Sequence, residues 1–254
     1  MVFANLGDTR AVTNTVNVRP VEDNSQSEHY VFDCNVWTKQ STFDHKATHE
    51  REAARVTAQS RDPRAVRRSA NAGTDDSVRV AGSLAITRSF GDFYLKYPEF
   101  SQNAEVAKHL PYLIKEPFFS SSTFRLPKGL IREFSAMDFT FVVIASDGLW
   151  DYLSNQDVMN CAARFLLHNR GRYLDMLNDS RSNPVPGFEH EVDGTNSENV
   201  TEALLHLVLT KIAKKRGTTT SALLKAQPGS RRSLFDDTTI TVIVTCGRTL
   251  FHEH

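Results

Sequence analysis

The segment from Phe141 to Asp151, which reads FVVIASDGLWD, places a run of apolar and β-branched residues directly before Ser146, Asp147 and Gly148. Such a run predicts a buried strand over residues 139–145, and a strand that ends in an aspartate holds that carboxylate rigidly. Asp151 adds a second carboxylate four residues later. Gly148 permits a sharp backbone turn at this point. Taken alone, the segment favours an ordinary Asp-Gly turn after a strand.

A second acidic pair, Asp236-Asp237, precedes another β-branched run, Thr239 to Val244. If the two strands are neighbours, the carboxylates of Asp147 and Asp236 converge at one end of a sheet. Two convergent carboxylates with oxygen-only surroundings suit a hard cation such as Mg²⁺ or Mn²⁺, which keeps several water ligands. The alternative is that both are turn carboxylates that accept hydrogen bonds from backbone amides. Each site alone favours that alternative, and the two together favour a metal site.

The remaining pattern predicts strands interleaved with helices. We expect a hairpin over residues 2–12, a strand over 30–37, helix-forming sequence over 47–59, a loop over 60–79 and short strands over 111–117 and 122–126. Ser154 and Asp157 form a capping box at the start of one helix. A second helix is expected over residues 198–216, with basic residues in its last turn and Gly217 at its end. Residues 169–198 are interpreted as a surface insertion.

The composition gives no support to several classes of function. Lys and Arg number 30, and Asp and Glu also number 30, so the net charge of +0 gives no support to binding of nucleic acid or a membrane surface. The three cysteines (Cys34, Cys161 and Cys246) form neither a disulfide framework nor a zinc pattern, which favours a reducing compartment. We therefore expect an intracellular protein without a signal peptide or membrane span.

Several segments, in order, resemble the C-terminal motifs of the metal-dependent PPM-type (type-2C) Ser/Thr protein phosphatases. They are VFANLGDTRAV at residue 2, FDHK at residue 43 with Glu50 and Glu52 after it, GSLAITRSFGDFYLK at residue 82, ASDGLWDYLSNQD at residue 145, and RRSLFDD at residue 231, which runs into DDTTITVIV. The matches span residues 2–245. Each motif is moderately specific, and it is their shared order and spacing that identify the family.

The resemblance implies an α+β fold, a four-layer α-β-β-α sandwich of two mostly antiparallel sheets flanked by helices, with its N-terminal part missing. Residues 1–247 are then a partial phosphatase domain, and residues 248–254 are a C-terminal tail. The family's upstream half carries an acidic residue, an arginine that binds the substrate phosphate, and a DGHGG motif, and none of these occurs here.

The resemblance also implies roles for individual residues. Asp147 and Asp236 match metal ligands, and Asp44 and Asp151 match an additional, weaker metal site of some members. The alternative for Asp44 and Asp151 is that they are surface turn and helix-start carboxylates. Supporting positions near the site are Gly148, Arg88, Asp92 and Asp237, with Arg88 held by acidic neighbours. Trp150 is interpreted as a core anchor and His45 as a structural residue.

The implied reaction is hydrolysis of phosphoserine or phosphothreonine in proteins by a metal-activated water, with no catalytic side chain among the residues present. A complete member uses two or more Mg²⁺ or Mn²⁺ ions. We expect phosphoprotein substrates, a monomer, a location in cytoplasm, nucleus or mitochondrion, and little activity of this chain on its own. The alternative function is a non-catalytic phosphatase remnant that acts as a binding or regulatory module.

Overall fold

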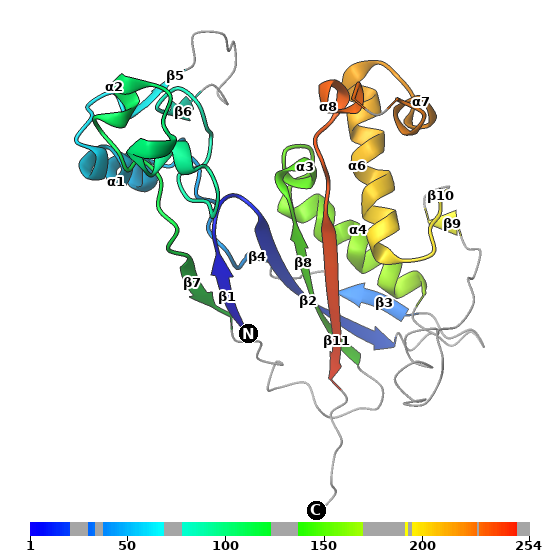
Figure 1. Ribbon diagram of the computed structural model, residues 1–254. Helices are drawn as coiled ribbons and strands as arrows, with labels where there is room; N and C mark the ends of the chain where they lie inside the picture. The colour runs from blue at the N-terminus through cyan, green and yellow to red at the C-terminus, as the bar shows by residue number, and fades with distance from the viewer. Residues whose placement is uncertain are drawn as a thin grey trace, which may run out of the picture. The chain divides into compact units, whose positions relative to one another are not determined.

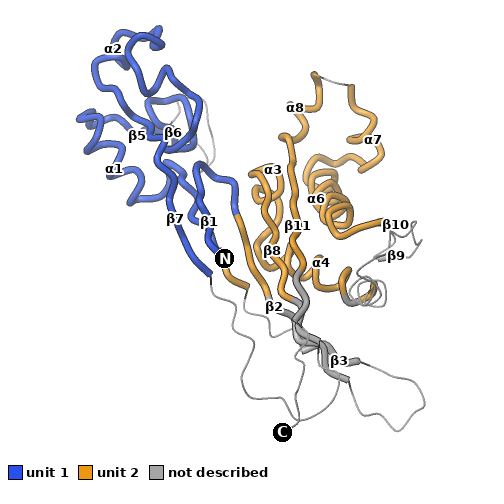
Figure 2. Tube along the Cα trace, turned by 60° about the horizontal axis from the view of Figure 1, so that its bottom comes forward, with its two compact units in different colours: residues 1–10, 41–122 blue, residues 11–40, 123–254 orange. Residues whose placement is uncertain are grey.

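A computed structural model of the chain describes residues 1–20, 30–33, 38–68, 78–122, 137–169, 191–192, 195–227 and 229–247 (Figure 1). Two compact units share these residues (Figure 2). Unit 1 comprises residues 1–10 and 41–122, and unit 2 comprises residues 11–40 and 123–254. The chain therefore leaves unit 1 after its first strand, returns to it, and leaves it again.

Unit 2 is built on a sheet in the order β11-β8-β2-β3, with β4 also paired to β2. The strands are β2 (Arg10–Pro20), β3 (Tyr30–Asp33), β4 (Lys39–Gln40), β8 (Met137–Ala145) and β11 (Ile240–Gly247). β11 runs antiparallel to β8, from the pair Ile240–Ala145 to the pair Gly247–Asp138. Phe141, Val143 and Ala145 alternate along β8 and are buried in one core, as the period of two in a strand requires.

Two helices, α4 (Asn155–His168) and α6 (Val200–Arg216), cover this face of the sheet (Figure 1). α4 begins with a reciprocal capping box, because Asp157 N donates to Ser154 Oγ at 3.1 Å and Ser154 N donates to an Asp157 carboxylate oxygen at 3.1 Å. Asn199 caps the N-terminus of α6, where its side chain accepts from Glu202 N, and Gly217 caps the C-terminus in the left-handed region with φ of 63°. The helices bury apolar side chains against the strands, among them Val158, Ala162, Phe165, Leu204, Val208 and Ile212.

Shorter elements complete unit 2. They are α3 (Asp147–Trp150), α7 (Thr220–Leu224), α8 (Arg231–Leu234), and a small pair formed by β9 (Glu191–Val192) and β10 (Thr195–Asn196). Leu223 of α7 is buried in the same core as α6. In the described part of the chain, no helix is both long and apolar enough to cross a membrane.

Unit 1 has its own small core. Its elements are β1 (Val2–Asn5), α1 (Glu50–Ser60), β5 (Val66–Arg68), β6 (Val78–Val80), the 3₁₀ helices η2 (Phe93–Leu95) and η3 (Pro98–Phe100), α2 (Ala104–Ala107) and β7 (Phe118–Ser121). β1 pairs with β7 and β5 pairs with β6, both antiparallel. The core side chains include Val56, Val80, Leu95, Tyr112 and Leu113.

The hairpin expected over residues 2–12 is wrong, although both strands are present. β1 pairs with β7, whereas β2 belongs to the sheet of unit 2. The turn residue Gly7 has φ of 93°, and its carbonyl accepts from His45 N at 2.9 Å. Asn5 Nδ2 donates to Phe43 O at 2.8 Å. The turn is therefore fixed by the segment at residues 43–45 rather than by a facing strand.

Two other expectations need correction. The region 60–79 was expected to be a loop, but Val66 and Val80 pair across β5 and β6. Residues 111–117 were expected to form a strand, but Tyr112 N donates to Leu95 O and the strand begins only at Phe118. The burial of Tyr112 and Leu113 in the core explains their apolar pattern without a strand.

The other elements agree with expectation. The strand over 139–145 and the helices beginning after Ser154 and near residue 198 are confirmed. Each unit combines helices with antiparallel strand pairs, which confirms the α+β class, while the four-layer arrangement stays a prediction. Outside the described residues lie positions 34–37 of the strand expected over 30–37, positions 123–126 of the strand expected over 122–126, most of the insertion expected over 169–198, and the tail 248–254.

Candidate metal centre

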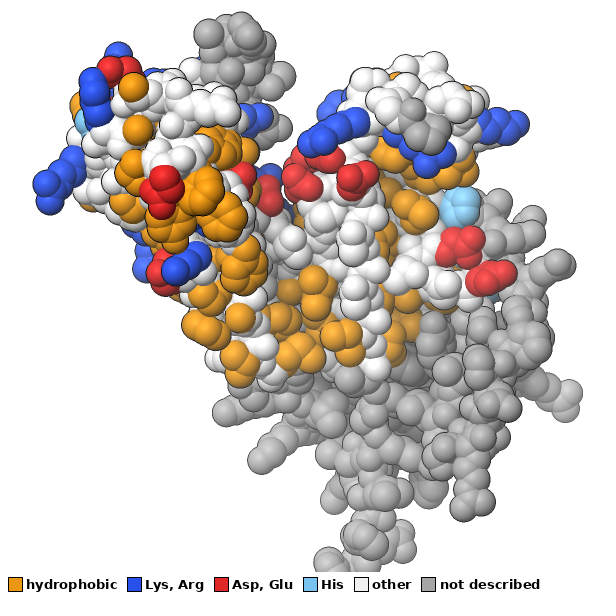
Figure 3. All heavy atoms as spheres, in the orientation of Figure 1, with side chains coloured by type: hydrophobic (Ala, Val, Ile, Leu, Met, Phe, Trp, Pro, Cys, Tyr) orange, Lys and Arg blue, Asp and Glu red, His pale blue; other side chains and the backbone are white. Residues whose placement is uncertain are grey.

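The ends of β8 and β11 hold the two aspartates singled out by the sequence. Ile240 of β11 pairs with Ala145 of β8, so the residues that lead into β11 lie beside those that follow β8. The condition for convergence of Asp147 and Asp236, that their strands are neighbours, is met. Figure 3 shows acidic side chains gathered over α3 and the start of β11.

Ser146 fastens these two strand ends together. Its N–H donates to Thr239 O at 3.1 Å, its hydroxyl donates to Asp237 O at 3.1 Å, and the same hydroxyl oxygen accepts from Thr239 N at 3.0 Å. Ser146 occupies the N-cap position of α3, yet its side chain makes no capping bond there. The hydroxyl is therefore used across the strands. Nothing in the local sequence beyond a Ser before an Asp at a strand end indicates this contact.

Gly148 allows the two segments to approach closely. A Cβ at this position would lie 2.6 Å from Asp237 O and 2.6 Å from Thr238 Oγ1, closer than real Cβ contacts come. Gly148 lies in α3 and is not among the glycines with positive φ. The sequence suggested that a sharp turn requires a glycine here. The structure shows a different reason, which is close contact with the neighbouring backbone of Asp237.

Asp147 and Asp151 both belong to the turn of α3. Asp151 N donates to Asp147 O at 2.9 Å, so the two residues are one helical turn apart on one side of α3. Asp147 is half-buried and Asp151 is exposed. Trp150 anchors the turn, because its ring is buried and Nε1 donates to Ala145 O at 2.8 Å. The position of Asp147 is thus set by packing beneath it.

Asp236 and Asp237 are exposed at the other strand end. Asp237 N donates to Asp236 Oδ1 at 2.8 Å, which orients that carboxylate, and Asp237 places its backbone carbonyl against Gly148. The exposed carboxylates of this strand end supply oxygen donors, the kind that a hard cation with retained water ligands prefers. Within the described residues, no group of three or more His, Cys, Asp or Glu side chains is arranged to hold a metal ion.

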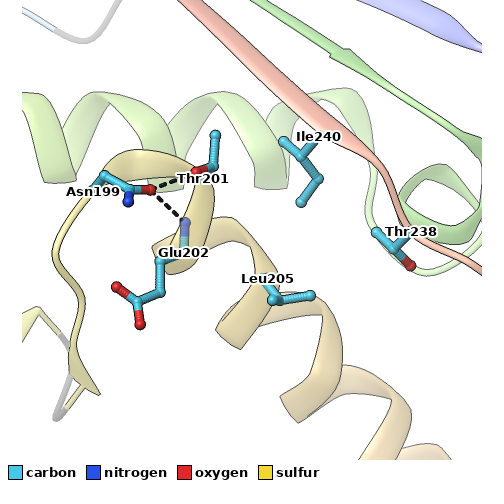
Figure 4. A pocket seen from close by; sticks show the side chains of 6 residues that line it. All are labelled: Asn199, Thr201, Glu202, Leu205, Thr238 and Ile240. Atoms are coloured by element: carbon cyan, nitrogen blue, oxygen red, sulfur yellow. Dashed lines mark hydrogen bonds between the residues drawn. The ribbon is translucent and has the colours of Figure 1, made fainter.

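A shallow depression of about 260 Å³ lies next to this strand end (Figure 4). Its lining residues are Asn199, Thr201, Glu202, Leu205, Thr238 and Ile240. The Asn199 side chain already accepts from Glu202 N at 3.0 Å, and the Glu202 carboxylate disfavours an anion there. The depression therefore adds no phosphate-binding group to the candidate centre.

Asp44 belongs to unit 1, and its carboxylate is occupied by Arg10. Arg10 Nη2 donates to Asp44 Oδ2 at 2.5 Å, and Arg10 Nε lies 3.1 Å from the same oxygen. Asp44 is 3% exposed. A cation at Asp44 would have to compete with this guanidinium, because Arg already satisfies the carboxylate with charge-assisted hydrogen bonds. The neighbouring His45 is fully buried, with Nδ1 3.0 Å from Gly7 O.

Arg88 lies against Glu52 of α1 in unit 1. Arg88 Nη2 donates to Glu52 Oε1 at 2.7 Å, and Thr87 Oγ1 and Arg55 also donate to this carboxylate. Burial by itself raises the pKa of Glu52, but the hydrogen bonds from Arg88, Arg55 and Thr87 outweigh it and lower the pKa to about 2. This buried network fixes the start of the TRSFGD segment to α1.

The rest of the TRSFGD segment is held by a lysine that the sequence reasoning missed. Lys96 Nζ donates to the backbone carbonyls of Ser89, Phe90 and Gly91. Asp92 follows in the left-handed region with φ of 54° and begins η2. Burial lowers the pKa of Lys96. A lysine seven residues after a serine carries no sequence signal of such a role, because the contact depends on the η2 turn.

Comparison with known proteins identifies the family of this chain. The family model described as protein phosphatase 2C matches residues 1–182. The chain belongs to the protein phosphatase 2C family. Probable protein phosphatase 2C 67 of Arabidopsis thaliana is 32% identical over 166 residues, covering 65% of this chain and 35% of that protein. Probable protein phosphatase 2C 72 of Oryza sativa subsp. japonica is 29% identical over 245 residues, covering 96% of this chain and 49% of that protein.

The chain thus spans half or less of the length of these curated relatives. A solved structure of a C. elegans sex determining protein is 21% identical, with a TM-score of 0.36, and the match covers 65% of this chain and 28% of that one. The family assignment depends on the sequence matches, not on this structure.

Proposed function

We propose that this chain is part of a metal-dependent protein serine/threonine phosphatase that acts on phosphoserine and phosphothreonine. The observation that carries the proposal is the pair Asp147 and Asp236, at neighbouring strand ends that Ser146 fastens and Gly148 allows to meet. Membership of the protein phosphatase 2C family supports the reaction class. Phosphoproteins are the proposed substrates.

Asp147 and Asp236 would hold Mg²⁺ or Mn²⁺ through carboxylate oxygens, and water would supply the remaining ligands. When bound, such a cation supplies Lewis-acid activation of water and neutralises charge on phosphoryl oxygens. The chain's own residues contribute rigidity: Trp150 anchors the α3 turn, and the Ser146 hydroxyl fixes Asp237 beside it. We propose low turnover by the 254-residue chain itself, because its sequence contains no DGHGG motif.

The test is a titration of the purified chain with Mn²⁺, followed by calorimetry or by the paramagnetic resonance signal of free Mn²⁺. Asp147→Asn and Asp236→Asn should each weaken binding by at least about tenfold, since each removes one carboxylate of the pair. Glu99→Gln, an exposed acid of unit 1, is the matched control and should leave the affinity unchanged. Equal affinities in all four proteins would overturn the assignment of the site.

Activity distinguishes the phosphatase from the non-catalytic alternative. Hydrolysis of a phosphoserine peptide that requires Mn²⁺ and disappears in Asp147→Ala supports the enzyme. A chain that binds Mn²⁺ at this site but shows no hydrolysis above the Asp147→Ala background instead supports the binding or regulatory module. Turnover at the level of an ordinary enzyme would contradict the low activity proposed for this chain.

A further inference from the structure

The stretch from residue 203 to residue 235 carries seven Lys or Arg residues and no Asp or Glu, although the whole chain has 30 of each sign. Six of these cations lie between the last turn of α6 and α8, and all six are exposed. We call them the basic surface: Lys214, Lys215, Arg216, Lys225, Arg231 and Arg232. Although the whole chain has no net charge, positive charge is therefore concentrated at one end of unit 2.

Part of the basic surface has a structural explanation. Lys214, Lys215 and Arg216 occupy the last turn of α6, where cations interact favourably with the helix dipole. Lys215 Nζ lies 5.2 Å from the centre of the Tyr152 ring. Arg231 donates to Ala226 O at 2.8 Å and to Leu224 O at 3.2 Å, which ties α8 to α7.

These roles leave a group of cations without a neutralising partner. Among the described residues, no carboxylate lies within ion-pair distance of Lys214, Arg216, Lys225 or Arg232. Lys225 and Arg232 lie at the C-terminal ends of α7 and α8, but these helices have only five and four residues, against 17 in α6. Their mutual repulsion is a cost that an anionic ligand would relieve.

The basic surface adjoins the candidate metal centre. α8 leads through Phe235 directly into Asp236, so Arg232 lies four residues before that candidate ligand. Figure 1 shows α7, α8 and the C-terminal end of α6 at the same end of unit 2. Figure 3 shows basic side chains there, directly beside the acidic side chains over α3 and the start of β11.

We propose that the basic surface binds an acidic segment next to the phosphorylated residue of the substrate. The substrate class is then phosphoserine or phosphothreonine flanked by Asp, Glu or further phosphorylated residues. This inference rests on the proposed function and extends it from the reaction to the sequence around the reacting phosphate. Complementary charge at the edge of a site increases the association rate and selects partners.

The surroundings favour a peptide over the other anionic partners. An apolar face that inserts would strengthen membrane binding, and Leu224 is the sole large hydrophobic residue exposed over the described part of 210–235. Stacking on aromatic rings would strengthen binding of single-stranded nucleic acid, and no aromatic ring is exposed on this stretch. Asp236 and Asp237 would also repel a continuous polyanion that extends past α8.

The experiment measures binding of fluorescent phosphoserine peptides by anisotropy in the presence of EDTA. One peptide has Asp and Glu flanks, and its partner has Asn and Gln at the same positions. The unaltered chain should bind the acidic peptide about tenfold more tightly, and added salt should remove the preference. The variant Lys214→Gln/Arg216→Gln/Arg232→Gln should lose it, since exposed ion pairs each change affinity by about two- to fivefold.

The matched control removes the same total charge elsewhere. Lys39→Gln/Lys108→Gln/Lys115→Gln replaces three exposed lysines and should keep the preference for the acidic peptide. Lys225→Gln alone should weaken acidic-peptide binding by about two- to threefold, which provides a second variant if the triple variant is unstable. Arg231 is left intact because it ties α7 to α8.

Equal loss in the basic-surface and control variants would overturn the proposal, since it would reduce the effect to net charge. Tighter binding to phosphatidylserine vesicles or to a single-stranded RNA of equal charge than to the acidic peptide would also overturn it. Because EDTA removes free metal ions, the peptide assay is independent of the proposed metal site. If the proposed function fails, Mn²⁺ does not bind but the peptide preference remains. If this inference fails, the peptide preference is absent but Mn²⁺ still binds.

Discussion

Gly148→Ala is the sharpest test of how the candidate metal centre is built. The new Cβ would lie 2.6 Å from Asp237 O, and ordinary van der Waals contacts begin at 3.4 Å, so the carbonyl must retreat by about 0.8 Å. That oxygen belongs to the backbone and accepts from Ser146 Oγ, so the shift also strains the bond that fastens the strand ends. Overpacking of this kind costs about 1–3 kcal/mol, and a weakened hydrogen bond adds about 1 kcal/mol.

One term opposes this loss, because alanine is the better helix former by about 1 kcal/mol. We therefore expect Gly148→Ala to lower the free energy of unfolding by about 1–3 kcal/mol and to weaken Mn²⁺ binding. The measurements are urea unfolding and Mn²⁺ titration. Gly91→Ala is the control, since a Cβ there meets no atom within 4 Å. If both variants unfold at the same urea concentration and bind Mn²⁺ equally, close packing at Gly148 is not what positions the site.

Two further predictions concern the framework. Glu52→Gln should destabilise the protein by about 3 kcal/mol at neutral pH, because it removes the buried carboxylate that neutralises the half-buried guanidinium groups of Arg88 and Arg55. The folded-state pKa of Glu52 lies below its usual value, so its contribution to stability is present above pH 4.5 and is lost as the pH falls toward about 2. Urea midpoints across that range should depend less on pH in Glu52→Gln than in the exposed control Glu99→Gln, and parallel curves would contradict the pairing. Ser154→Ala should cost about 1 kcal/mol, while Ser154→Thr retains most of the stability; equal urea midpoints for the two would show that the cap does not stabilise α4.

Local signals in the sequence were sufficient for the two long helices of unit 2, α4 and α6. Ser154 with Asp157 marks the start of α4 and Gly217 marks the end of α6 through bonds within a few residues, and the structure contains those bonds. The run before Asp147 was also sufficient for β8, since five consecutive apolar residues leave few alternatives. In each case the physical cause lies within one turn or one strand of the signal.

Which strands pair with each other could not be predicted in the same way. Residues 2–12 have the pattern of a hairpin, yet β1 pairs with a strand that begins at Phe118, because the segment at residues 43–45 takes up the turn at Gly7. At the candidate site, the sequence indicated Asp147 and Asp236 on the condition that their strands are neighbours. The Ser146 bridge and the close contact at Gly148 exist only once that pairing has formed.

The pairing of β8 with β11 has a consequence for folding. Ala145 and Ile240 are paired although α4 and α6 lie between them in the sequence. Their contact therefore closes a long loop, and contacts between residues far apart in the sequence form slowly. β11 is also the last strand of the described chain to leave the ribosome. Asp147 is therefore in place before Asp236 can join it, and we expect the candidate metal centre to assemble late. Mn²⁺ affinity would then report completed folding of unit 2, and the cation would stabilise the state in which its last strand has docked.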